Sequence, residues 1–159
     1  MLGPWLIFLR KLLSPISANI TLATTVPGNP QFVPSFVTQA KTFNGGIDVD
    51  ILHDKQTPSS SLSVQVQNAL AESVVRLDSK FEGMFSVQTK LDQVTIRNQT
   101  TSRGGGKPGA KERVISFDQR SPGRASGWVG WGQRPPPRTF GKGHVDIVSS
   151  LSPVTLDLG

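Results

Sequence analysis

Apolar and polar residues alternate along most of this chain, and one stretch of that alternation occurs twice. Segment 83–96 aligns without a gap on segment 143–156, sixty residues later. Apolar falls on apolar at Phe85/Val145, Val87/Ile147, Leu91/Leu151, Val94/Val154 and Ile96/Leu156. The period is two on either side of a short interruption, which is typical of two half-buried strands joined by a tight bend. We therefore predict that 83–98 and 143–158 are equivalent strand–bend–strand units, with the last four matched pairs facing inward.

The bend inside each unit limits how its two strands can be arranged. Asp92-Gln93 occupies the bend of the first unit, and Ser152-Pro153 occupies that of the second. Two-residue hairpins favour turns with positive φ at the first central position, or at both, and proline cannot adopt positive φ. The alternative is an arc, in which the second strand joins a different sheet. This favours a β-solenoid or a β-sandwich over a simple meander.

The remainder of the chain shows shorter alternating runs separated by turn residues. From residue 19 to residue 159 we predict a single all-β domain with a repeat architecture, either β-solenoid-like or a β-sandwich of short strands. Two segments rich in Gly, Pro and charge, 100–111 and 133–140, are predicted to be poorly ordered loops.

The first eighteen residues differ from the rest. An apolar run from Met1 to Leu13 contains Arg10-Lys11 and is followed by Pro15. The run is too short to span a bilayer, and its charges follow the apolar residues instead of preceding them as in a signal peptide. We expect residues 1–18 to be a short helical or disordered segment outside the β domain.

Composition excludes several kinds of chemistry. The chain has no cysteine, which rules out disulfides, thiolate nucleophiles and thiolate metal sites. Hydrophobic residues make up only 36% of the chain, and glycine and proline number 16 and 12, so a modest core with many loops is expected.

Positive charge is concentrated in one segment. The net charge of the chain is +6, yet residues 97–142 carry ten basic and two acidic side chains, a net +8. Such a segment can attract a polyanion, namely nucleic acid, an acidic cell-wall polysaccharide or anionic lipid, or it can be a solvated loop that protects strand edges. The candidate polyanion contacts are Arg103, Lys107, Lys111, Arg113, Arg120 and Arg124.

Candidate catalytic and metal-binding residues are few. Asp48 and Asp50 share a strand face near His53, but no second histidine accompanies them, so a polar stripe is a better interpretation than a metal site. Neither His53 nor His144 lies in a nucleophile motif. We therefore expect no enzymatic activity and no cofactor.

The two tryptophans of segment 128–131 fall on opposite faces of one predicted strand. Trp131 shares the face of Val129 and is expected in the core. Trp128 is then a candidate exposed aromatic that binds sugar or a partner.

The pieces Phe81-Glu82-Gly83, Val129-Gly130-Trp131-Gly132 and 149–156 carry a family resemblance. Over about residues 44–159 the chain resembles a group of uncharacterised fungal proteins, mostly from mushroom-forming fungi, with an adhesin-like β-repeat domain. In that group, apolar residues and proline usually precede the phenylalanine, whereas this chain has Asp78-Ser79-Lys80. The resemblance implies an all-β repeat fold without known catalytic residues. The expected function is a non-enzymatic scaffold or adhesion module; the alternative is polyanion binding through 97–142.

Overall fold

The computed structural model describes residues 5–24, 33–57, 60–98, 112–136 and 143–159, which form twelve β-strands in two sheets and no helix. The seven-stranded sheet contains, in spatial order, β1 (Trp5–Arg10), β3 (Ser35–Lys41), β5 (Ser61–Asn68), β11 (Gly143–Ser149), β7 (Gly83–Thr89), β10 (Arg124–Trp131) and β9 (Arg113–Ser121). The five-stranded sheet contains β2 (Ile16–Leu22), β4 (Ile47–His53), β6 (Ser73–Leu77), β12 (Val154–Leu158) and β8 (Val94–Asn98). The predicted all-β fold class is confirmed.

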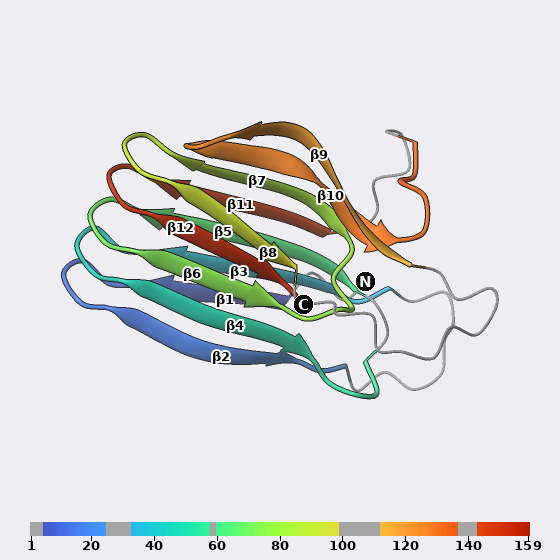
Figure 1. Cartoon of the computed structure of the whole chain (residues 1–159). Helices are drawn as coiled ribbons and strands as arrows, with labels where there is room; N and C mark the ends of the chain where they lie inside the picture. The colour runs from blue at the N-terminus through green and yellow to red at the C-terminus, as the bar shows by residue number, and fades with distance from the viewer. Residues whose placement is uncertain (1–4, 25–32, 58–59, 99–111, 137–142) are drawn as a thin grey trace.

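Strands are organised as coils that each contribute one strand to either sheet. The chain runs along the seven-stranded sheet, turns through a bend, and returns along the five-stranded sheet; the coils are β1–β2, β3–β4, β5–β6, β7–β8 and β11–β12. Neighbouring coils pair in parallel in both sheets, and their bends gather at one end of the molecule, on the left in Figure 1. The arc predicted from Pro153 is therefore present, and the arrangement is solenoid-like.

The two sequence repeats lie side by side. β11 pairs with β7, and β12 pairs with β8, with the register Gly143↔Gly83 and Val154↔Val94. The predicted equivalence of the two units is confirmed residue for residue. Their shared glycine has a steric cause, because a Cβ on Gly83 would lie 1.9 Å from the carbonyl oxygen of Gly143.

The chain order and the spatial order of the coils differ at one point. The last coil, β11–β12, is inserted between β5–β6 and β7–β8, so that strands 60 residues apart are neighbours. In the sequence between β8 and β11, the chain forms the hairpin β9–β10. This hairpin extends only the seven-stranded sheet, and its strand β10 is antiparallel to β7. The C-terminal residues therefore join the middle of the structure to its upper part (Figure 1).

The core lies between the two sheets and consists of rows of aliphatic side chains contributed by successive coils. In the seven-stranded sheet one such row is Val66, Ile147 and Val87, and in the five-stranded sheet one is Val49, Val75 and Leu156. Val94 and Ile96 are only partly buried, because β8 is the edge strand of its sheet.

The prediction that Leu91 and Leu151 face inward is wrong. Their side chains are 76% and 45% exposed, and they lie in the bends beside other exposed apolar residues. The physical reason is that the inner corner of each bend is occupied by a small polar residue that satisfies the backbone of the turn. An apolar side chain there would leave buried carbonyls without donors.

These inner-corner residues form a ladder across four coils: Thr42, Asn68, Ser149 and Thr89. Asn68 Nδ2 donates to the carbonyl oxygens of Gly45 at 3.0 Å and Ala71 at 2.5 Å. Thr89 Oγ1 donates to the carbonyl oxygen of Ser152 at 3.0 Å. These side chains thus hold a bend of their own coil or of an adjacent coil.

The expectation of a helical or disordered N-terminal segment outside the β domain is also wrong for the residues described. Residues 5–10 form β1, which pairs in register with β3, and residues 16–22 form β2, which pairs in register with β4. The apolar run supplies strand residues, and the segment around Pro15 forms the first bend. The predicted loop 100–111 and the second half of 133–140 lie outside the described residues, and residues 133–136 belong to no strand.

Two alanine substitutions in the second repeat test which of its side chains face the core. Ile147 is fully buried, so Ile147→Ala should lower the free energy of unfolding by about 2–5 kcal/mol. Leu151→Ala should change it by no more than about 0.5 kcal/mol, because this leucine lies at the surface. Chemical denaturation of both variants measures the difference, and equal costs would contradict the assignment.

Candidate functional site

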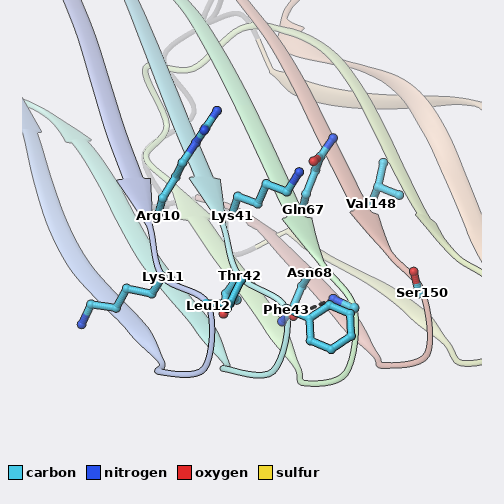
Figure 2. A pocket seen from close by; sticks show the side chains of 11 residues that line it. Arg10, Lys11, Leu12, Lys41, Thr42, Phe43, Gln67, Asn68, Val148 and Ser150 are labelled. Carbon is cyan, nitrogen blue, oxygen red and sulfur yellow. Dashed lines mark hydrogen bonds between the residues drawn. The ribbon is translucent and has the colours of Figure 1, made fainter.

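An open groove lies on the outer face of the seven-stranded sheet, where four strands reach their bends. Arg10, Lys41, Gln67 and Val148 stand in one row because β1, β3, β5 and β11 are paired in register. Figure 2 shows their side chains projecting from the same face. The groove has a volume of about 640 Å³ and is lined by Arg10, Lys11, Leu12, Lys41, Thr42, Phe43, Gln67, Asn68, Ala69, Val148 and Ser150.

A smaller hollow of about 210 Å³ continues this groove along the strands. It shares Arg10, Lys41 and Gln67 with the groove and adds Gln39 and Gln65. Gln39 Nε2 donates to Gln65 Oε1 at 2.9 Å across adjacent strands. The combined surface therefore presents amide donors and acceptors beside its cations.

The charged residues that line the groove are all basic. Arg10, Lys11 and Lys41 contribute three positive charges, and no acidic residue is found among the described lining residues. Arg10 and Lys41 are register partners on strands about 4.8 Å apart, a placement in which like charges destabilise the sheet. An anion bound between them would relieve that repulsion. The nearest acidic residue in register is Asp146, beside Gln65 on the far side of the hollow.

A second polar cluster lies at the opposite end of the strands from the bends. His53 Nδ1 lies 2.9 Å from Asp78 Oδ1, and His53 Nε2 lies 2.6 Å from Ser60 Oγ. Asp78 Oδ2 also accepts the backbone N–H of His53 at 2.6 Å. A proton on Nδ1 lets the ring donate to the Asp78 carboxylate, and the Ser60 hydroxyl completes the contact at Nε2.

The Ser60–His53–Asp78 order resembles that of a hydrolase triad, but its setting favours a structural role. Ser60 is 7% exposed and the His53 side chain is 1% exposed. His53 ends the coil β3–β4, whereas Ser60 and Asp78 lie just before and just after the coil β5–β6, so the hydrogen bonds tie these two neighbouring coils together. We call this cluster the histidine clamp. Sequence reasoning missed it because 25 residues separate His53 from Asp78 and no local motif connects them.

The segment that follows Asp78 strengthens the clamp. Lys80 Nζ donates to the carbonyl oxygens of Asp54 at 2.8 Å and Thr57 at 2.8 Å. The carbonyl oxygen of Ser79 accepts hydrogen bonds from Arg113 and from Trp131 Nε1. Burial lowers the pKa of Arg113 from its ordinary value, although the charges of nearby acidic residues oppose this shift.

The predicted metal-site candidates are used in other ways. Arg76 Nη1 lies 2.5 Å from Asp48 Oδ1 and 3.0 Å from Asp50 Oδ1, on the outer face of the five-stranded sheet. Hydrogen bonds to Asp48 and then Asp50 raise the pKa of Arg76. Within the described ranges, no group of three His, Asp or Glu residues is arranged to hold a metal ion.

The basic residues of 97–142 do not gather on one surface of the described chain. Arg113 is buried, with its guanidinium 5.6 Å from the Trp131 ring. Arg120 lies 4.8 Å above the Phe117 ring, whereas Arg124 is exposed at the start of β10. Arg103, Lys107 and Lys111 lie outside the described residues, so their role as polyanion contacts stays a prediction.

The predicted roles of the two tryptophans are reversed. Trp128 is only 2% exposed, which excludes it as an exposed binding aromatic. Its ring lies over Gly130, where a Cβ would come within 2.3 Å of Trp128 Cζ2, so the missing side chain makes room for the indole. Trp131 is partly exposed and is held by its hydrogen bond to Ser79.

Comparisons with known proteins give no assignment. No family model matches the chain, and searches of curated proteins and of solved structures found no match. The resemblance to fungal adhesin-like repeats therefore stays a prediction. The described residues also contain no helix that is long and apolar enough to cross a membrane.

The histidine clamp should make stability depend on pH. Burial raises the pKa of Asp78, but the hydrogen bonds from the His53 ring, the His53 N–H and the Lys80 N–H outweigh it, so the net pKa is lowered. A lowered folded-state pKa stabilises the fold above the unfolded value of about 4, and this stability is lost as pH falls through the folded pKa. Asp78→Asn should therefore destabilise the protein at pH 7 and flatten the loss of stability below about pH 4. Thermal unfolding from pH 2 to 7 measures both effects, and an unchanged pH profile would contradict the role assigned to Asp78.

Proposed function

We propose that this protein is a non-enzymatic β-solenoid module that binds an acidic polysaccharide along the groove beside its bends. The observation that supports this proposal most is the row of cations on a groove whose described lining contains no carboxylate. Among the described residues Arg10, Lys11 and Lys41 form no ion pair, and a negatively charged ligand would remove the electrostatic cost of placing like charges on neighbouring coils.

The lining chemistry suits carboxylated sugar rings. Arg10 offers a planar fork that can hold a carboxylate through two hydrogen bonds, and Lys41 offers a point charge beside it. The amides of Gln39, Gln65 and Gln67 suit hydroxyl groups of a sugar. Nucleic acid fits less well, because Phe43 is the only aromatic residue among the described lining residues on which a base could stack.

The groove is also suited to an extended chain. Its row of side chains runs across the strands, and in register it continues through Gln88 to Arg124 on β10. Lys41 and Arg124 are four strands apart, a span of about 19 Å. The exposed Arg124 thus connects the groove with the basic segment 97–142 that the sequence singled out.

Removing two groove cations tests this proposal. The double variant Arg10→Gln/Lys41→Gln should bind polygalacturonate about tenfold more weakly, which corresponds to about 1.4 kcal/mol. Its binding should also respond less to added salt, because fewer screened contacts are left. Isothermal titration at two salt concentrations measures both changes.

A matched control removes the same charge elsewhere. Lys55 and Arg97 are exposed and lie away from the groove, so Lys55→Gln/Arg97→Gln should keep most of the affinity. An equal loss in both double variants would show that only net charge matters. Equal, salt-insensitive binding of a neutral glucan would also contradict the proposal.

A further inference from the structure

The first coil leaves an apolar edge uncovered. β1 and β2 are the edge strands of the two sheets, at the bottom of the molecule in Figure 1. Trp5, Leu6 and Phe8 on β1 are 65%, 53% and 53% exposed. The inward-facing Ile20 on β2 is only partly buried, although its register partner Ile51 on β4 is fully buried.

This edge lacks the usual protection against pairing. Natural edge strands carry charges, prolines or bulges that stop another strand from joining them. β2 has no charged residue, and the only charge on β1 is Arg10 at its end. Within the described chain, no strand pairs with the outer side of β1 or β2. The unpaired backbone groups of an edge without such protection favour pairing with another β-strand.

The opposite end of the molecule has a different construction. There, the antiparallel hairpin β9–β10 extends the seven-stranded sheet alone, and a register shift between Ser126 and Gly127 interrupts its pairing. β9 also carries charges, among them Asp118 and Arg120. The flat apolar edge of one copy cannot continue both sheets of another copy at this end. Head-to-tail stacking is therefore disfavoured.

We propose that a second copy of this chain covers the free edge of the first coil, which gives a closed two-fold dimer in which β1 pairs antiparallel with β1 of its partner. Charge favours this orientation, because Arg10 and Lys11 lie at and just beyond one end of the strand. Antiparallel pairing places the cations of the two copies at opposite ends, whereas parallel pairing would stack them together. The dimer proposal does not rest on the proposed groove function, although Arg10 belongs to both surfaces.

Light scattering coupled to size exclusion tests the dimer on the full 159-residue chain. The wild-type protein should have twice the chain mass of 17.1 kDa. Leu6→Lys/Phe8→Lys places two charges on the proposed interface and should give a monomer. Leu70→Lys/Leu91→Lys makes the same exchange at exposed leucines in the bends and should remain a dimer.

A single cysteine provides a readout that does not depend on destabilising substitutions. Because the chain has no native cysteine, Phe8→Cys near the middle of β1 should form a disulfide-linked dimer on mild oxidation, and Leu91→Cys should not. A monomeric wild-type protein would overturn the proposal. So would dissociation by the bend variant alone, or particles that keep growing with concentration, as open head-to-tail stacking would produce.

Discussion

Each coil of this protein must present the same pattern of side chains at the same register as the coil beside it. Parallel in-register pairing places the residues of one row side by side, so that an inward row is apolar and the inner-corner row is polar, whereas the outer row of Arg10, Lys41, Gln67 and Val148 is mixed. The inward rows, such as that of Val66, Ile147 and Val87, form the core. The polar row of Thr42, Asn68, Ser149 and Thr89 closes the bends. The same register forms the groove on the outer face, where the side chains of Arg10, Lys41 and Gln67 lie next to one another.

The sequence predicted the repeat because its two copies are direct neighbours in register, and neighbours share one packing environment. It predicted the arc through Pro153 for a local steric reason. Leu91 and Leu151 were misplaced because strict alternation was continued into a bend, where buried backbone groups require polar partners. Trp128 was misplaced because its burial depends on the absence of a side chain at Gly130. The first coil was missed because its strands pair with residues about 30 positions away.

The candidate site was only partly accessible to sequence reasoning. Charge counting drew attention to 97–142, yet Arg113 from that segment is buried against Trp131. The groove cations Arg10 and Lys41 are 31 residues apart in the chain and meet because β1 and β3 pair in register. The histidine clamp likewise joins two coils. Functional groups in a stacked fold are brought together by register, which a single local motif does not record.

Disulfide cross-linking between strands tests the central claim, namely that β11 is inserted between β5 and β7. The register partners Asp146/Ser86 and Asp146/Gln65 lie on adjacent strands, within the Cα separation that a disulfide requires. Ser86 and Gln65 are two strands apart, about 9.6 Å, which is too far. In a chain without native cysteines, the first two cysteine pairs should cross-link and the pair 65/86 should not. Efficient cross-linking of 65/86, with none to 146, would mean that the coils stack in chain order and would contradict this account.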